Sequence, residues 1–170
     1  LLVAAQDGHH EVVAALIAAR ASVDQATNDG VTPLFMAAVK GHHEVVAALT
    51  AARANVDKAA KNGATPLLLA AGHNHAALAR LLLARGANVE LKQRQGTTAL
   101  MFACLNGHDP CARVLIKAKA DIEATEEDGW TALMFCAQNG HDLCARGMIK
   151  AGSNVNADTN DGFTSLMLVA

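Results

Sequence analysis

The chain of 170 residues repeats itself every 33 residues, and this period restricts its fold more than any other feature. The letters GHHEVVAAL at residues 8–16 return at residues 41–49. Four more columns keep the same step, and their members are Gly30, Gly63, Gly96, Gly129 and Gly162; Thr32, Thr65, Thr98, Thr131 and Thr164; Leu34, Leu67, Leu100, Leu133 and Leu166; and His9, His42, His75, His108 and His141. Such periods are typical of small units that stack into an array, because one unit alone cannot bury its apolar face.

Each unit consists of a turn and two predicted helices. In one unit, residues 28–30 (Asn-Asp-Gly) are a turn signal, and Thr32 followed by Pro33 is typical of a helix start, with Thr as the N-cap. Gly41 ends this first helix, and residues 42–52 are expected to form the second. Hydrophobic residues make up 52% of the chain but aromatic ones only 3%, so Ala and Leu dominate and favour helices over strands. The sequence therefore predicts an all-α solenoid.

The period also predicts the organisation of the chain. We expect one continuous array over residues 1–170, made of a partial unit at 1–26, full units at 27–59, 60–92, 93–125 and 126–158, and a partial unit at 159–170. Solenoids need polar capping units, and neither end shows one. We therefore expect the chain to be a fragment of a longer protein, with further repeats at both ends.

The repeated motifs resemble those of the ankyrin repeat family. The matching segments are GVTPL at 30–34, GATPL at 63–67, the Ala-Ala pairs at 37–38 and 70–71, Gly-His at 41–42 and 107–108, and GANV at 86–89. The resemblance covers the whole chain. It implies L-shaped units in a slightly curved solenoid, with the turns projecting as a row of fingers and the first helices lining a concave face.

The resemblance also implies a function. In this family the concave face and the finger tips bind other proteins, so we expect a non-catalytic scaffold or adaptor module. An alternative is that the chain is the regulatory or substrate-targeting segment of a larger protein, such as a kinase or a ubiquitin ligase, whose catalytic part lies outside it.

The chain departs from the family pattern at three kinds of position. The His that often follows Thr-Pro-Leu is replaced by Phe35, Leu68, Met101, Met134 and Met167, so we expect an apolar contact in place of a hydrogen bond to the Thr. The loop Gly kept at Gly86 and Gly152 becomes Arg20, Arg53 and Lys119. A non-Gly residue in left-handed conformation costs roughly 1–2 kcal/mol, so we expect these loops either to be strained or to close differently. Gly147 lies inside a predicted helix, which it should weaken by about 1 kcal/mol.

No motif for catalysis, a metal or a cofactor stands outside the repeat. Neither His10-Glu11 nor His43-Glu44 is followed by a second His at zinc-protease spacing, and no Cys and His spacing suits structural zinc. A Gly-rich phosphate loop is missing as well. We therefore predict no enzyme activity, no catalytic residue, no metal and no cofactor. The five periodic histidines are expected to bond to the backbone in the tight turn between the helices.

Charge and cysteine content exclude other classes. A net charge of −2 argues against a nucleic-acid partner, and no apolar run approaches the roughly 18 residues of a membrane span. The four cysteines, at 104, 111, 136 and 144, stand among apolar neighbours and are expected to be buried thiols. This favours an intracellular protein, cytoplasmic or nuclear.

Residues that vary between units are the candidates for binding a partner protein, because stacking constrains the periodic ones. At the finger tips and the ends of the first helices these candidates are Asp29, Val31, Lys40, Lys61, Asn62, His73, Arg94, Gln95, Asn106, Glu127, Asp128, Trp130, Gln138, Asn139, Asp161 and Phe163.

Two features of this candidate surface allow two interpretations each. Trp130 and Phe163 are either exposed binding residues or covers for a neighbouring finger. The fingers run from basic to acidic, which either orients a partner of opposite charge or is ordinary solvated surface. The charged residues of this gradient are Lys58, Lys61, Lys92, Arg94, Glu123, Glu126, Glu127 and Asp128.

Overall fold

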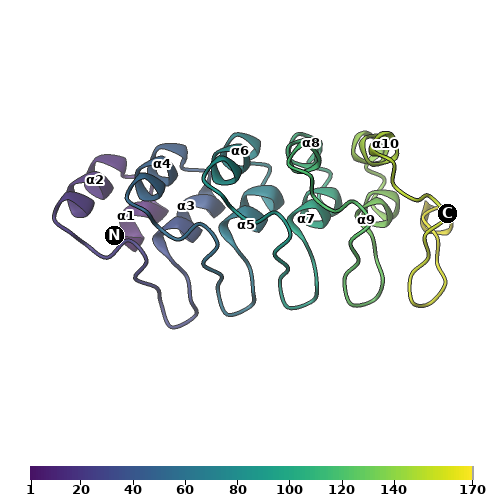
Figure 1. Ribbon diagram of the computed structural model, residues 1–170, viewed down its shortest axis with the longest axis horizontal. Helices are drawn as coiled ribbons and strands as arrows, with labels where there is room; N and C mark the ends of the chain where they lie inside the picture. The colour runs from purple at the N-terminus through teal and green to yellow at the C-terminus, as the bar shows by residue number, and fades with distance from the viewer. Residues whose placement is uncertain (170) are drawn as a thin grey trace.

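The structure is a computed structural model that describes residues 1–169. Within these residues the chain forms ten α-helices and one short 3₁₀-helix (Figure 1). Their bounds are α1 Leu2–Gln6, α2 His10–Ala18, α3 Pro33–Lys40, α4 His43–Ala51, α5 Pro66–Gly72, α6 Ala76–Ala84, α7 Ala99–Leu105, α8 Asp109–Lys117, α9 Ala132–Gln138, α10 Asp142–Ala151 and η1 Met167–Val169.

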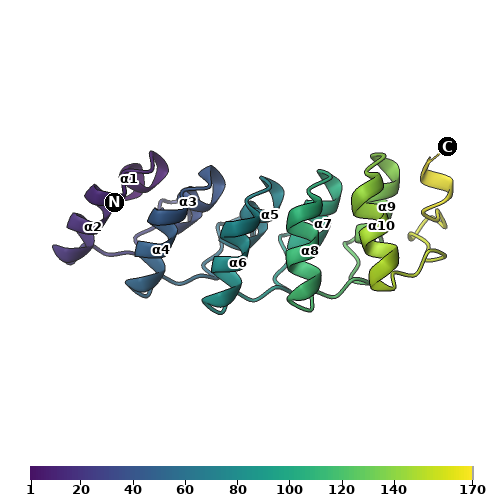
Figure 2. The same cartoon turned by 90° about the horizontal axis from the view of Figure 1, so that it is seen from above.

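The helices lie in two layers. The odd-numbered first helices stack side by side in one layer, the even-numbered second helices form the other, and the turns project as a row of fingers on the side away from the second helices (Figures 1 and 2). The predicted all-α solenoid is therefore confirmed. The end of the last partial unit, at residue 170, lies outside the described residues.

The first helices start at threonine caps, as predicted. Thr32 Oγ1 accepts a hydrogen bond from the backbone N–H of Phe35 at 3.1 Å, and the three following units repeat this bond. The sequence predicted only apolar contact from the residues that replace the family's His. In two units the replacement does more, because the backbone N–H of Thr98 donates to Sδ of Met101 at 3.5 Å and that of Thr131 donates to Sδ of Met134 at 3.4 Å.

The loops after the second helices close in the same way whether or not they contain glycine. Arg53 has φ +64° and Lys119 has φ +66°, so both are left-handed, as expected. The next residue bonds back to the helix in each loop: the N–H of Ala54 donates to the carbonyl of Leu49, and that of Ala120 to Leu115. The substitution therefore leaves the closing hydrogen bond in place and adds only the conformational cost of a side chain at positive φ.

We expect Lys119→Gly to raise the free energy of unfolding by about 1 kcal/mol, because glycine adopts this conformation without a Cβ penalty. Gly86→Ala is the matched reverse change, since Gly86 has φ +89° and a Cβ there would meet no other atom within 4 Å. Gly86→Ala should lower the free energy of unfolding by a similar amount. Urea unfolding of both variants measures the two values, and a loss of stability in Lys119→Gly would contradict the assignment of strain.

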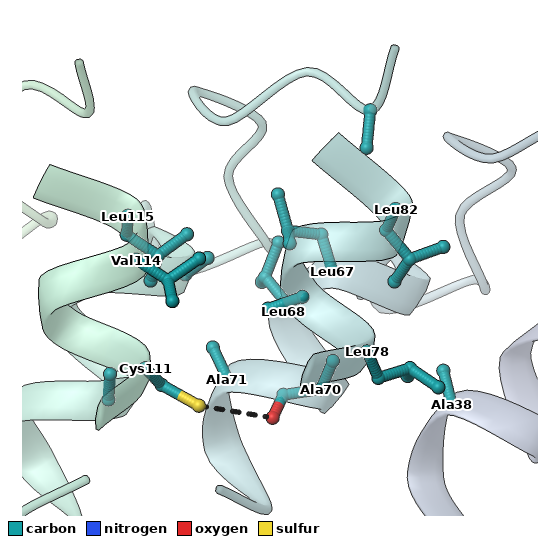
Figure 3. Packing of buried hydrophobic residues seen from close by; sticks show 14 of the residues in the cluster. Ala38, Leu67, Leu68, Ala70, Ala71, Leu78, Leu82, Cys111, Val114 and Leu115 are labelled. Atoms are coloured by element: carbon teal, nitrogen blue, oxygen red, sulfur yellow. Dashed lines mark hydrogen bonds between the residues drawn. The ribbon is translucent and has the colours of Figure 1, made fainter. Parts of the chain in front are cut away.

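The core is a continuous row of leucines and alanines between the two layers. Figure 3 shows Leu67 and Leu82 in one unit and Leu115 in the next, all buried. Cys111 lies at this junction and donates to the carbonyl of Ala70 over 3.7 Å (Figure 3). All four cysteines are free and buried, as predicted.

The histidine column joins neighbouring units rather than closing its own turn. His75 donates through Nε2 to the carbonyl of Val39 at 3.1 Å, and His141 donates to the carbonyl of Leu105 at 3.0 Å. His42 makes the same bond to Gln6 at 2.9 Å. The prediction of a backbone bond was right for four of the five histidines, all but His9 of the first unit described. The acceptor, however, lies near the end of the preceding unit's first helix, where carbonyls have no partner within the helix.

Glycine makes room for these histidines. A Cβ on Gly41 would lie 2.6 Å from Cε1 of His75, and one on Gly107 would lie 2.6 Å from Nδ1 of His141. In the remaining junction Asn74 stands at this position, with φ +61°, and His108 bonds differently, through Nδ1 to the carbonyl of Ala71. The Cβ of Asn74 takes up the space that glycine leaves elsewhere, so the ring adopts another orientation.

A column of acidic residues makes a second set of bonds between units. The carboxylate of Asp24 accepts from the backbone N–H of Asn55 at 3.0 Å, and that of Glu123 accepts from the N–H of Asn154 at 2.9 Å. Asp57 and Glu90 make the corresponding bonds in the middle units. These side chains therefore hold consecutive loops together.

Candidate functional site

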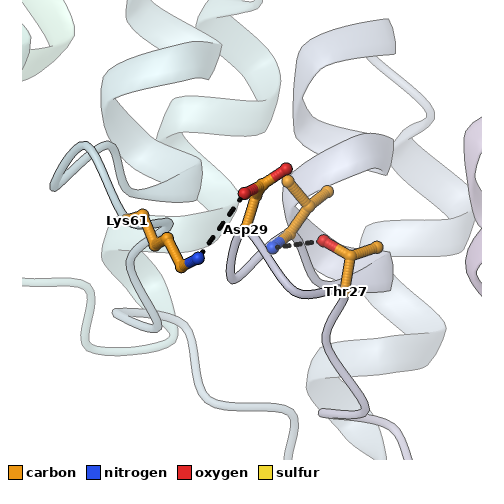
Figure 4. A network of polar contacts seen from close by, with 4 residues as sticks. Thr27, Asp29 and Lys61 are labelled. Atoms are coloured by element: carbon orange, nitrogen blue, oxygen red, sulfur yellow. Dashed lines mark hydrogen bonds and ion pairs between the residues drawn. The ribbon is translucent and has the colours of Figure 1, made fainter.

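Each finger is a tight hairpin whose tip is closed by backbone hydrogen bonds. In the first finger the N–H of Thr27 donates to the carbonyl of Val31 at 3.0 Å, and the N–H of Gly30 donates back to Thr27 at 2.9 Å. Gly30 has φ +81°, which is the left-handed conformation that such a hairpin requires. Thr27 Oγ1 also accepts from the N–H of Val31, as Figure 4 shows.

Neighbouring fingers are linked at their tips. The backbone N–H of Lys61 donates to the carbonyl of Asp29 at 2.8 Å, and Arg94 donates to Asn62 at 3.0 Å. The side chains of Lys61 and Asp29 form an ion pair at 3.7 Å, in which both are well exposed (Figure 4). An exposed pair of this kind stabilises little, so the backbone bonds are what keep the fingers in register.

Two hollows lie between the fingers and the first helices, and we call them the inner grooves. The first has a volume of about 320 Å³ and an apolar floor formed by Leu68, Leu69 and Phe102. Its polar rim contains the predicted residues Asn62, His73 and Asn106.

The second inner groove has a volume of about 440 Å³ and shares Phe102 with the first. Leu105 and Phe135 complete its apolar floor. Its rim is acidic on one side, where the predicted residues Glu127 and Asp128 lie, and the predicted Gln95 also lines it.

The structure thus brings six of the predicted binding residues into the inner grooves and leaves the others outside them. Those outside are Asp29, Val31, Lys40, Lys61, Arg94, Trp130, Gln138, Asn139, Asp161 and Phe163. All sixteen predicted residues are exposed except Val31 and Trp130, which are half-buried.

The two aromatic candidates differ in their surroundings. The ring of Trp130 packs against Phe135, with ring centroids 5.3 Å apart. Trp130 therefore covers the first helix of its own unit, which neither sequence interpretation anticipated. Phe163 is 49% exposed and remains available to a partner.

Some predicted binding residues also serve the helices that carry them. Asn106 donates through Nδ2 to the carbonyl of Phe102, and Asn139 donates to that of Phe135, both at 2.9 Å. The ring of His73 bonds to the carbonyl of Leu69 at 3.0 Å. These side chains satisfy carbonyls near the ends of the first helices and hold fixed positions at the groove rim.

Fewer charged residues contribute to the gradient along the finger tips than the sequence indicates. Glu123 bonds to the next loop, and the ammonium groups of Lys58 and Lys92 donate to the carbonyls of Asp24 and Thr125. These three charges are therefore part of the junctions between units. At the finger tips this leaves the Asp29–Lys61 ion pair, basic Arg94, and acidic Glu127, Asp128 and Asp161.

Sequence reasoning missed Phe102 and Phe135, which are the two aromatic residues of the inner-groove floors. Both are half-buried and belong to one column of the repeat, in which the earlier units carry Met36 and Leu69. A change from aliphatic to aromatic residues within one apolar column was the available signal. How exposed the two rings are depends on the distance between the fingers and the first helices, which the sequence does not show.

The described residues contain no group of three or more His, Cys, Asp or Glu side chains arranged to hold a metal ion. Burial raises the pKa of the Cys111 thiol to about 11. Hydrogen bonding with Cys136 and Cys144, together with burial, also raises the pKa of Cys104. Both thiols are thus protonated at neutral pH, a state that is weakly nucleophilic.

Comparisons with known sequences agree with this architecture. The family model for ankyrin repeats in three copies matches residues 1–60 and 48–126, and that for ankyrin repeats in many copies matches residues 106–157. No curated protein that was compared with the chain matches it. Among the described residues no helix has the length and apolar character needed to cross a membrane.

Proposed function

The chain belongs to the ankyrin repeat family, and from this membership we propose that it is a non-catalytic module that binds a partner protein along its finger tips and inner grooves. Repeats of this family are in general protein–protein interaction modules. The proposal concerns which surface is used and what kind of partner it accepts.

The observation that carries the proposal is the continuity of the two inner grooves through Phe102. Apolar side chains form their floor, and exposed polar side chains such as Asn62 and Gln95 stand at their rim. An apolar centre with a polar rim is the usual composition of a protein-binding surface. An extended or turned segment that crosses two fingers would bury apolar side chains on both floors.

The tip charges support a particular orientation of the partner. Arg94 stands on one finger and Glu127 and Asp128 on the next. A partner that carries acidic residues at one end and basic residues at the other would be steered into one direction along the row.

Trp130→Ala is expected to weaken binding of the partner by about 2 kcal/mol, because interface aromatics commonly contribute that much. Its ring packs on Phe135, so the change should also lower the free energy of unfolding by about 1 kcal/mol. Binding is measured by retaining a partner from a cell extract on the immobilised chain and then titrating the purified partner.

Trp130→Phe separates the two effects, because it keeps a ring against Phe135 and removes the indole. Glu44→Lys, on α4 in the other layer of helices, controls for unspecific loss of binding. A partner retained equally by the native chain and by Trp130→Ala would show that the partner binds elsewhere.

We further propose that additional repeats cover the last described unit and that the protein is intracellular, cytoplasmic or nuclear. Leu166 and Met167 expose 79% and 60% of their surface, and a stacked repeat would bury both. Four buried thiols outside any disulfide support a reducing compartment.

A further inference from the structure

The layer of second helices carries a basic surface that the repeat does not require. The helices α6, α8 and α10 contain five basic residues and two acidic ones, and the whole chain has a net charge of −2. Positive charge is therefore concentrated on these three helices, and the rest of the chain is net negative. The five basic residues are Arg80, Arg113, Lys117, Arg146 and Lys150.

These basic residues line two adjoining hollows between the helices, which we call the outer groove. The hollow between α6 and α8 has a volume of about 600 Å³, and the hollow between α8 and α10 has about 560 Å³. Arg113 and Lys117 line both, so the outer groove continues across α8. Figure 2 shows these helices side by side along the array.

The floor of the outer groove is apolar. Leu83 and Val114 line the first hollow, and Ile116 and Leu143 line the second. Leu143 exposes 64% of its surface, although a residue of this type is usually buried when its position serves only the core.

Only part of the positive charge is neutralised within the chain. Arg113 pairs with Asp109 at 2.9 Å and Arg146 pairs with Asp142 at 2.8 Å. Arg80, Lys117 and Lys150 are exposed and form no ion pair with any residue that the structure describes.

Gly147 opens the second hollow. The equivalent residues of the two preceding units are Leu81 and Val114, whereas Gly147 has no side chain. A Cβ there would meet only Asp109 Oδ1, at 3.8 Å, which is ordinary contact. Packing therefore does not require glycine, which weakens the helix by about 1 kcal/mol. Its effect on the surface is to leave space between α8 and α10.

From this combination we propose that the outer groove is a second binding surface, for an acidic amphipathic helix of another protein. Its apolar side chains would enter the two hollows, and its carboxylates would meet the basic side chains at the rim. Grooves between parallel helices accept such a helix through apolar anchors spaced three or four residues apart. A membrane surface or a nucleic acid matches the charge, but neither supplies apolar side chains that fill hollows of this depth.

The proposal is tested by fluorescence titration of the 170-residue chain with a labelled peptide of about 18 residues, long enough for five helical turns. The peptide has leucines on one helical face and glutamates on the other. A peptide of the same composition in scrambled order is the reference, and we expect it to bind at least tenfold more weakly.

Two variants of the chain separate shape from charge. Gly147→Leu fills the second hollow with the residue found at position 81, leaves the charge unchanged and should weaken binding at least tenfold. Lys117→Glu reverses a charge shared by both hollows and should weaken binding by a similar factor. Arg53→Glu, in the loop after α4, is the charge-reversing control outside both hollows and should bind as the native chain does. Thermal melts verify that each variant is folded.

Equal binding of the ordered and scrambled peptides would overturn the proposal, as would native affinity in Gly147→Leu or Lys117→Glu. So would binding of phosphatidylserine vesicles or of duplex DNA in the absence of peptide binding, because that result assigns the basic surface to another class of ligand. None of these outcomes bears on the inner grooves, since their floor residues Phe102 and Phe135 belong to the first helices, in the other layer.

Discussion

Leu100→Ala is expected to lower the free energy of unfolding by about 2–5 kcal/mol, the largest loss we expect from a single core change. Leu100 is only 1% exposed and belongs to α7, which packs between α5 and α9. Removal of its side chain leaves a cavity that neighbouring helices fill incompletely, so lost burial and lost contacts add together.

The position of Leu100 in the array adds to its effect. In a solenoid each unit contacts only its neighbours, and stability is close to a sum of unit and junction contributions. A weakened middle unit is therefore expected to reduce the coupling between the two halves and to broaden the urea transition.

Leu143→Ala is the matched control, because it makes the same chemical change at a side chain that is 64% exposed. Surface changes of this kind usually stay within about 0.5 kcal/mol. Urea unfolding followed by circular dichroism measures both variants. Equal midpoints for the two would show that Leu100 is not a core residue.

Gly107→Ala is expected to lower the free energy of unfolding by about 2–5 kcal/mol, although it adds a single methyl group. Gly107 has φ +68°, where a Cβ costs roughly 1–2 kcal/mol. The new Cβ would also lie 2.6 Å from the ring of His141 and would displace it from the carbonyl of Leu105. Loss of that hydrogen bond adds about 1–3 kcal/mol.

Gly140→Ala isolates the histidine contribution. Gly140 has nearly the same conformation, with φ +67°, but a Cβ there would meet no other atom within 4 Å. It should therefore lose only the conformational part, about 1–2 kcal/mol. Combining Gly107→Ala with His141→Ala completes a double-mutant cycle, in which the two losses should be less than additive. Strict additivity would mean that the ring does not occupy the space above Gly107.

Asn74, the equivalent of Gly107 in the preceding unit, shows how the array tolerates a side chain at this position. Its Cβ stands where Gly107 has none, and His108 still reaches a carbonyl, that of Ala71, by bonding through Nδ1. The junction therefore has a second hydrogen-bonding arrangement, and asparagine accepts positive φ more readily than alanine does. This tolerance explains why one unit lacks the glycine without losing its bond to its neighbour.

Most of the fold was predictable from the sequence because the signals are local. The hydroxyl of Thr32 accepts from an N–H three residues later, and Gly41 reverses the chain within one turn. Both features can therefore be recognised from a short stretch of sequence. The candidate site was predictable only in part. Variability between units correctly selected exposed residues such as Asn62 and Glu127, but it did not select Phe102, which occupies an apolar column.

The sequence by itself determined the period, the helix starts and ends, and the order of the units, because each depends on residues a few positions apart. Only the tertiary structure decided the contact of Trp130 with Phe135 within one unit and the contacts between units, which are the histidine and carboxylate bonds across 31 to 37 residues and both sets of grooves. The physical reason is that these contacts depend on the distance and rotation between stacked units. The packing of many side chains at once sets that geometry, and no single repeat motif contains it.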